Sequence, residues 1–345
     1  MAEITIKDIA EKCGVGIGTV SRAINNHPNI NSETRERVLA VIKEMGYIPN
    51  NSARNLKRTD AKCIAVLIKG IINPFFSTAV QTIEAGIQKA GYSMVMQHVE
   101  AYENEVEVAL QLIKEKRLRG IIFLGGAFVH DKKMLDMMSV PFIFSTIGGA
   151  ANEDRKQTYS NVSVDDRAES KKMVRYLLEL GHRDIAILTE DVSASSVGQL
   201  RLEGYWEAFT EKEIAVNEKL IWKIDDKEEP YSMENGYAAT KKLLESGEKF
   251  TALFAISDFL AIGACRALRE AGLKIPEDVS VAGFDGIAFG EYFNPQLTTI
   301  RQPIEEMSEK TVQLLLDVIE EKCGHEHLVF PARLTIREST APCNK

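Results

Sequence analysis

The sequence predicts a small all-α domain at the N-terminus, followed by an α/β body of two lobes, each built on a doubly wound parallel sheet. Two observations lead to this fold class. Residues 6–45 carry apolar side chains at helical spacing in three short runs, which glycines interrupt. From Cys63 onward, short apolar runs alternate with amphipathic helical segments, and this alternation restarts after Val162. Such alternation gives parallel sheets, and two successive series give two lobes.

The N-terminal residues predict two short helices joined by a tight turn. Residues 6–13 have apolar positions at helical spacing, Gly14-Val15-Gly16 interrupts them, and a second helix follows over residues 17–25. In a helix-turn-helix, this arrangement presents a recognition helix to the major groove of DNA. The spacing therefore predicts a helix-turn-helix DNA-binding domain over residues 1–49.

A third helix is expected over residues 34–45, with Asn31 or Ser32 as its N-cap and Gly46 as its stop signal. Its apolar stripe would consist of Val38, Leu39, Val41 and Ile42. The residues that follow, 50–60, have helical character for one or two further turns. Because so short a helix orders only when something packs on it, we expect a hinge helix and linker there.

The net charge of −8 is unevenly distributed along the 345 residues. Residues 1–60 hold nine Lys or Arg against seven Asp or Glu, whereas the rest holds 33 against 43. This asymmetry indicates that only the N-terminal part meets phosphate. No apolar run reaches the roughly 18 residues that span a bilayer, and no signal peptide pattern is present. With five scattered cysteines, we expect a cytoplasmic protein, associated with the nucleoid when bound to DNA.

The body alternates between strands and helices in chain order. Buried strands are expected at residues 63–68, 94–96, 120–124, 141–144, 185–189, 252–256 and 279–284. Helices are expected at residues 75–90, 167–180, 199–211, 233–246 and 259–271. In open α/β sheets, ligands bind outside the carboxyl ends of the strands. A cleft between the two lobes is therefore the expected site for a small molecule.

Four segments of the N-terminal part carry a resemblance to a known family. They read T-I-K-D-I-A-E from Thr5, T-V-S-R-A-I-N from Thr19, T-R-E-R-V from Thr34, and G-Y-I-P-N-x-x-A-R-x-L from Gly46. As a set, they resemble the DNA-binding head and hinge of the lactose-repressor/galactose-repressor (LacI/GalR) transcription factors. The similarity continues through the rest of the chain, so a regulator with a sensor body is expected.

The resemblance implies that some residues of the head contact bases and that others contact the DNA backbone. Ile17, Gly18 and Arg22 would face base edges, and Arg22 can donate two hydrogen bonds to guanine. Leu56 would be an apolar wedge in the minor groove, with Ala53 and Arg54 beside it. The remaining contacts, mainly to phosphates, would come from Thr5, Thr19, Ser21, Asn25, Thr34, Tyr47 and Asn50. The alternative that Arg22 binds only phosphate remains open.

Two glycines depart from the usual pattern of the family. Gly16 stands where a serine that caps the recognition helix is usual, and glycine caps less well. Gly18 has no side chain with which to contact a base. We therefore expect few direct base contacts, with Ile17 and Arg22 responsible for discrimination.

By resemblance, the body over residues 61–345 has a type-I periplasmic-binding-protein-like fold that binds an effector and forms the dimer. The chain would cross between its lobes near residues 161, 291 and 323. Lobe 1 would comprise about 61–161 and 293–321, and lobe 2 about 163–290 and 325–340.

Several residues match the effector pocket of the family. The expected set is Phe75, Phe76, Thr146, Ser195, Val197, Arg201, Tyr231, Asp258 and Asp285. Arg201 and Asp285 can hold adjacent hydroxyls while Tyr231 or Phe76 covers an apolar face, which is chemistry suited to a sugar.

Structural roles remain open for several of these residues. Arg201 and Asp285 could pair only with each other, Asp258 could cap the helix that follows it, and Phe75 or Phe76 could be core. Thr146-Ile147 departs from the usual polar and aromatic pair, so a purine or an unusual sugar remains an alternative ligand.

No arrangement of residues predicts an enzyme, a metal site or a cofactor. His325-Glu326-His327 lies in a loop after a helix, and residues 193–196 lack a nucleophile elbow. Asp165 and Asp166 are neighbours whose side chains diverge, which is poor geometry for an acid–base pair. The glycines of residues 14–18 do not follow a strand, as a dinucleotide loop requires.

We therefore expect a homodimeric, ligand-responsive transcriptional regulator, a repressor that binds a pseudopalindromic operator and is switched by a sugar. The chain ends soon after Thr340 without a leucine heptad segment, which favours a dimer over a tetramer. Two alternatives remain: a cytoplasmic sugar-binding protein with a vestigial head, and a regulator that uses a purine or a protein corepressor.

Overall fold

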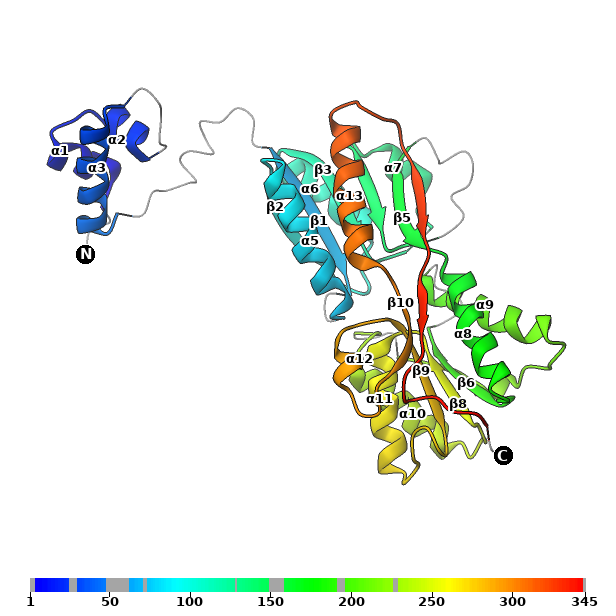
Figure 1. Cartoon of the computed structure of the whole chain (residues 1–345). Helices are drawn as coiled ribbons and strands as arrows, with labels where there is room; N and C mark the ends of the chain where they lie inside the picture. The colour runs from blue at the N-terminus through cyan, green and yellow to red at the C-terminus, as the bar shows by residue number, and fades with distance from the viewer. Residues whose placement is uncertain are drawn as a thin grey trace. The chain divides into compact units, whose positions relative to one another are not determined.

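The computed structural model describes residues 4–24, 30–47, 62–70, 73–127, 129–148, 158–190, 196–225 and 229–343. The chain divides into two compact units, residues 1–61 and 62–345, called the head and the body below (Figure 1). Among the described residues, no helix is both long and apolar enough to cross a membrane.

The head is a bundle of the helices α1 (Ile6–Cys13), α2 (Ile17–Ile24) and α3 (Ser32–Met45). Its core consists of Ile9, Ala10, Cys13, Val20, Ala23 and Val38. The Asn31 side chain caps α3 by accepting a hydrogen bond from the Glu33 amide at 2.9 Å. Gly46 ends α3 at a φ of 62°, a left-handed conformation that glycine adopts without strain. Leu39 was expected in the apolar stripe but is exposed, because it points away from the face on which Val38 lies.

The first sheet has the strand order β11-β5-β4-β3-β1-β2 within the described part of the body. Its strands are β1 (Cys63–Lys69), β2 (Ser93–Val99), β3 (Leu118–Leu124), β4 (Phe142–Ser145), β5 (Ser160–Val164) and β11 (His327–Phe330). Helices α5 (Phe75–Lys89) and α13 (Ile304–Ile319) lie side by side on one face (Figure 1). Helices α6 (Glu105–Glu115) and α7 (Lys132–Asp136) complete this lobe.

Both faces of strand β1, which lies between β3 and β2, are buried, as is usual for parallel sheets. Ile64, Val66 and Ile68 belong to the core cluster that includes side chains of α5. Ala65 and Leu67 belong instead to the cluster that includes side chains of α6. The apolar run from Cys63 therefore reflects burial on two sides, which places the carboxyl end of β1 between two helical layers.

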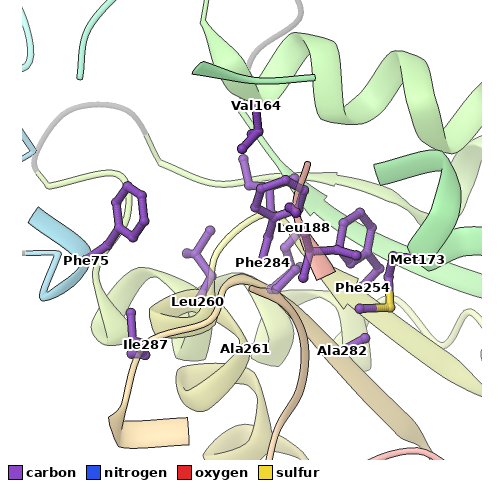
Figure 2. Close-up of a cluster of buried hydrophobic side chains, with 14 of the residues drawn as sticks. Phe75, Val164, Met173, Leu188, Phe254, Leu260, Ala261, Ala282, Phe284 and Ile287 are labelled. Carbon is purple, nitrogen blue, oxygen red and sulfur yellow. The ribbon is translucent and has the colours of Figure 1, made fainter. Parts of the chain in front are cut away.

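The second sheet has the order β12-β10-β9-β8-β6-β7, again counting described residues only. Its strands are β6 (Ile185–Thr189), β7 (Ile221–Lys223), β8 (Ala252–Ala255), β9 (Ser280–Asp285), β10 (Thr298–Arg301) and β12 (Arg333–Thr335). The helical elements are α8 (Asp166–Glu179), α9 (Val197–Glu211), the 3-10 helix η2 (Glu218–Leu220), α10 (Met233–Glu245), α11 (Asp258–Glu270) and α12 (Phe289–Tyr292). Phe254, Phe284, Leu188 and Met173 pack together in its core (Figure 2).

The described chain crosses between the sheets after β5, after β10 and after β11. The crossings expected near residues 291 and 323 lie later. β10 pairs in parallel with β9, with Thr298 opposite Ala282, so the second lobe extends to Arg301. β11 still belongs to the first sheet, beside β5, and β12 pairs with β10 in the second. Pro331, which has no amide hydrogen to donate, separates β11 from β12, and these two strands form the red segment between the lobes in Figure 1.

Candidate functional site

Helix α2 presents a solvent-facing surface that runs from its first turn to its last. Ile17 is 45% exposed, and Gly18 and Arg22 are also exposed, whereas Val20 and Ala23 face the core. Nε of Arg22 donates a hydrogen bond to the Gly18 carbonyl oxygen at 3.2 Å. The three residues expected to face base edges therefore share the outer side of one helix, and the Arg22 guanidinium lies along it.

The start of α2 lacks a capping side chain. The Gly16 carbonyl accepts hydrogen bonds from the amides of Thr19 at 2.8 Å and Val20 at 3.2 Å, so Gly16 occupies the N-cap position. At α1, the Thr5 hydroxyl donates to Asp8 Oδ2 at 2.7 Å. Of the other expected DNA contacts, Thr19, Ser21, Thr34 and Tyr47 are half-buried in the head. Asn25, Asn50, Ala53, Arg54 and Leu56 lie outside the described residues.

A cavity of about 410 Å³ lies in the body, at the carboxyl ends of β1, β3, β6 and β9. A volume of this size is within the range of small-molecule sites, roughly 300–1,000 Å³. Its lining contains seven of the nine expected effector residues: Phe75, Phe76, Thr146, Val197, Arg201, Tyr231 and Asp285. Ser195 lies outside the described residues, and Asp258 is not part of the lining.

Arg201, in the second turn of α9, is the charged centre of this cavity. Its Nε donates to Asp166 Oδ1 at 2.9 Å, and its Nη2 lies 2.8 Å from the same oxygen. Its Nη1 lies 3.6 Å from Asp285 Oδ1, and its guanidinium lies 3.7 Å from the ring centre of Phe284. Burial raises the pKa of Asp166 to about 6, although Arg201 opposes this rise. Arg201 is therefore held by two carboxylates, chiefly by Asp166.

Asp285 ends β9 in a backbone conformation with a φ of 114°, which is unusual for a residue with a side chain. Its Oδ2 accepts a hydrogen bond from Asn73 Nδ2 at 3.0 Å, and its Oδ1 accepts one from Gln302 Nε2 at 3.1 Å. Asn73 follows β1, so this bond joins the two lobes across the cavity. Burial raises the pKa of Asp285, and Arg201 partly offsets that effect.

Asp258, which was expected to contact a ligand, is not part of the cavity lining, because its carboxylate is hydrogen-bonded to neighbouring groups of the protein. Its Oδ2 accepts hydrogen bonds from the amides of Gly286 and Ile287, each at 2.8 Å. Its Oδ1 accepts one from the Thr299 hydroxyl at 2.6 Å. Burial, followed by the nearby Asp285 charge, raises the pKa of Asp258 to about 8. Asp258 thus holds the turn that follows Asp285, while Ser257 caps α11.

Aromatic side chains form apolar walls of the cavity. Phe75 is only 5% exposed and belongs to the core cluster that includes Leu260 and Ile287 (Figure 2). Phe76 is half-buried, and its ring centre lies 5.4 Å from that of Phe75. The hydroxyl of Tyr231 is buried without a hydrogen-bond partner among the described residues, and burial raises its pKa well above the ordinary value. Phe76, Tyr231 and the exposed Tyr102 of the lining are therefore aromatic surfaces available to a ligand.

Several polar residues of the cavity lining were missing from the expected effector set, as was Asp166, which lies behind Arg201. The missing lining residues are Lys69, Asn73, His98, Tyr102, Glu190, Ser196, Glu229 and Gln302. Lys69 and Glu190 stand at strand ends, where the general rule for α/β sheets could have indicated them. Asp166 was considered only as a partner of Asp165. Gln302 lies between β10 and α13, and no local pattern distinguishes it.

Comparisons with known proteins agree with this architecture. Residues 5–50 match the family described as "Bacterial regulatory proteins, lacI family", and residues 174–340 match "Periplasmic binding protein-like domain". The chain is 39% identical to the HTH-type transcriptional regulator MalR of Clostridium butyricum, over 97% of this chain and 99% of MalR.

Two solved structures are similar over nearly the whole chain. One is the Lac repressor dimer bound to operator and an anti-inducer, with 28% identity, a TM-score of 0.74, and coverage of 99% of this chain and 100% of that one. The other is the transcriptional regulator CelR in complex with cellobiose, with 29% identity and a TM-score of 0.69, covering 97% and 99%.

Proposed function

The chain belongs to the LacI family of bacterial regulatory proteins, and from this premise we propose that it is a repressor whose effector is a sugar. Its relatives are transcriptional regulators and repressors, and the chain is a helix-turn-helix transcription regulator like them. Two heads of a homodimer bind a pseudopalindromic operator with half-sites about one helical turn apart. The Lac repressor is itself a dimer on its operator.

The observation that supports a sugar is the pairing of charged and aromatic groups in one cavity. Arg201 and Asp285 face the same space as Phe76 and Tyr231. Charged hydrogen-bonding groups suit the hydroxyls of a sugar, while aromatic faces suit its C–H surface. The regulator CelR, similar over nearly the whole chain, was solved with cellobiose.

On the DNA side, we propose that Arg22 and Ile17 discriminate between operator sequences. Their exposure on one side of α2 supports this assignment. Operator variants should lose most affinity at the base pair opposite Arg22, and equal losses at every position would contradict a discriminating role for Arg22.

We propose that Leu56 of the hinge is an apolar wedge in the minor groove. Leu56→Ala should weaken operator binding and leave effector affinity nearly unchanged. Unchanged operator affinity would exclude Leu56 as a wedge.

A thermal-shift screen of the full chain against sugars, sugar phosphates and purines tests the proposed effector. A ligand at 100 times its Kd should stabilise the folded protein by about 2.7 kcal/mol. Each responding ligand is then added to the protein–operator complex, since effector and operator must affect each other's binding reciprocally. A response to purines alone would contradict the sugar and retain the regulator.

Asp285→Ala should abolish this response and leave operator binding without ligand intact. The carboxylate is expected to hold ligand hydroxyls, whereas the head carries the operator contacts. Operator affinity measured by fluorescence anisotropy, with and without the ligand found in the screen, provides the readout. If the ligand changes the operator affinity of the Asp285→Ala variant as much as that of the wild type, Asp285 is not part of the effector site.

A further inference from the structure

The cavity contains three positions at which proteins commonly bind a phosphate group. Two are the cationic side chains of Arg201 and Lys69. The third is the N-terminus of α9, where Ser196 and Val197 reach the lining, because the first amides of a helix attract anions. Whether these positions are free determines whether the cavity can accept a phosphorylated ligand.

Neither cation is free. Arg201 lies within 2.9 Å of Asp166 and 3.6 Å of Asp285, both of which are buried. Nζ of Lys69 donates to the Glu103 carbonyl oxygen at 2.6 Å and lies 3.3 Å from Glu105 Oε2. The remaining oxygen of Glu105 accepts a hydrogen bond from the Ala127 amide at 2.7 Å, which fixes the carboxylate beside Lys69. Each cation therefore already has a carboxylate partner from the protein.

A fourth carboxylate, that of Glu190, lies at the N-terminus of α9. Glu190 follows β6, and its Oε2 accepts a hydrogen bond from the hydroxyl of Ser196, the N-cap residue of α9. A Cβ at position 198 would lie 2.5 Å from this oxygen, so Gly198 leaves the space that the carboxylate fills. The Glu190 charge thus stands where a ligand phosphate would meet the helix, and it is stabilised by the helix dipole.

The charge of the lining agrees with this arrangement. Among the described lining residues, Lys69 and Arg201 are cationic, whereas Glu190, Glu229 and Asp285 are acidic. The one further group that can become cationic, His98, lies 3.6 Å from Glu100. A ligand phosphate would therefore enter a site with an excess of negative charge.

We propose that this cavity selects an uncharged effector over its phosphorylated form, and that Glu190 is the residue that determines this specificity. The inference rests on the proposed function in taking the cavity as the effector site. Beyond the proposed function, sugar phosphates are excluded from the cavity, and Glu190 is the group that repels them. Glu190 occupies the anion position at α9, and its charge opposes a phosphate there.

Glu190 also accepts the hydrogen bond of the Ser196 hydroxyl at the start of α9, so the test must separate the charge of Glu190 from its shape. Glu190→Gln keeps an oxygen that can accept the Ser196 hydrogen bond and removes only the charge. Glu203→Gln is the matched control, since it also replaces one negative charge by a neutral amide. Glu203 lies on α9, is half-exposed, pairs with Arg167 and is not part of the cavity lining.

Thermal shift and calorimetry on the full chain, at constant ionic strength, compare three proteins: wild type, Glu190→Gln and Glu203→Gln. The probes are glucose, maltose and cellobiose, their 6-phosphates, and inorganic phosphate. The wild type should bind an uncharged sugar at least about 100-fold more tightly than its phosphate. Glu190→Gln should narrow this ratio by about tenfold through tighter binding of the phosphate, and inorganic phosphate should stabilise it more than the other two proteins.

Equal or tighter binding of a 6-phosphate by the wild type would overturn the proposal. An equal response of all three proteins to inorganic phosphate would overturn the role of Glu190. If no sugar of either kind binds, the proposed sugar effector fails, while the inorganic phosphate comparison still decides what Glu190 excludes.

Discussion

The head exposes the two side chains that are proposed to discriminate between operator sequences, whereas the body buries two charged residues of its effector cavity. Ile17 and Arg22 lie exposed on α2, while Arg201 and Asp285 are each only 4% exposed. An exposed side chain is positioned by the helix that carries it. A buried charge also needs partners, and those of Arg201 come from distant parts of the chain, such as Asp166. Substitutions should therefore act locally in the head and through a network in the body.

Of the substitutions considered, Arg201→Met should lower the free energy of unfolding of the body the most. It leaves the buried carboxylates of Asp166 and Asp285 without their cation, which typically costs about 3–5 kcal/mol. Both tryptophans of the chain, Trp206 and Trp222, lie in the body, so their fluorescence during urea unfolding reports on this unit.

The exposed Arg175, which lies 4.0 Å from Glu211, provides the matched control. Arg175→Met should change the free energy of unfolding by no more than about 0.5 kcal/mol. A similar loss in both variants would contradict the central place of Arg201 in the body.

Asp258→Asn should alter the pH dependence of the body. In the folded protein the pKa of Asp258 is about 8, above its ordinary value of 3.8, so between these values the folded protein holds a proton that the unfolded chain releases. Stability from this group therefore falls as pH rises from about 4 to 8, by up to about 1.4 kcal/mol per pH unit. Asparagine does not titrate, so the variant should lose less stability than the wild type over this window.

Urea unfolding followed by tryptophan fluorescence at pH 5 and pH 8 measures this difference. If the free energy of unfolding changes with pH equally in the wild type and in Asp258→Asn, Asp258 is ionised in the folded protein throughout this range. The stability of the head should be the same in the wild type and in Asp258→Asn, because Asp258 belongs to the body.

Gly18→Ala should stabilise the head slightly, since glycine in a helix is less favourable than alanine by about 0.5 kcal/mol or more. An added Cβ would lie 3.9 Å from Arg22 Nη2, which is ordinary contact. Slower hydrogen exchange of the α2 amides is the expected readout. Gly14→Ala is the control: nothing lies within 4 Å of the added Cβ, but the φ of +63° should make the substitution destabilising.

Gly16→Ser should have the smallest effect, a gain of a few tenths of a kcal/mol. The added side chain has open space and can accept a hydrogen bond at the start of α2. The same exchange measurement detects this gain, and faster exchange at α2 would argue against Gly16 as the cap position.

Much of the architecture was predictable because it depends on local patterns. Helical spacing in the head and apolar alternation in the body reflect which side of each element is buried. The predicted strand at 185–189 matches β6, and the predicted helices at 75–90 and 233–246 match α5 and α10 to within a residue at each end. The strands β5, β7 and β10 were not among the predicted strands.

The effector cavity was predictable only in part. Arg201, Tyr231 and Asp285 line it as expected, since the carboxyl ends of strands meet at one edge of a sheet. Asp258 stands at a similar strand end, yet its carboxylate faces the amides of Gly286 and Ile287. A residue's position after a strand does not determine which neighbour its side chain meets.

The sequence by itself determined the order of the elements, the family and the helix face that carries Ile17 and Arg22, because these follow from short-range spacing and motif. Only the tertiary structure decided how charges are matched in the body. It pairs Arg201 with Asp166, Lys69 with Glu105, and the N-terminus of α9 with Glu190. The physical reason is that a buried charge must be neutralised by whichever group folding brings within a few ångströms, and that distance is set by the packing of two sheets.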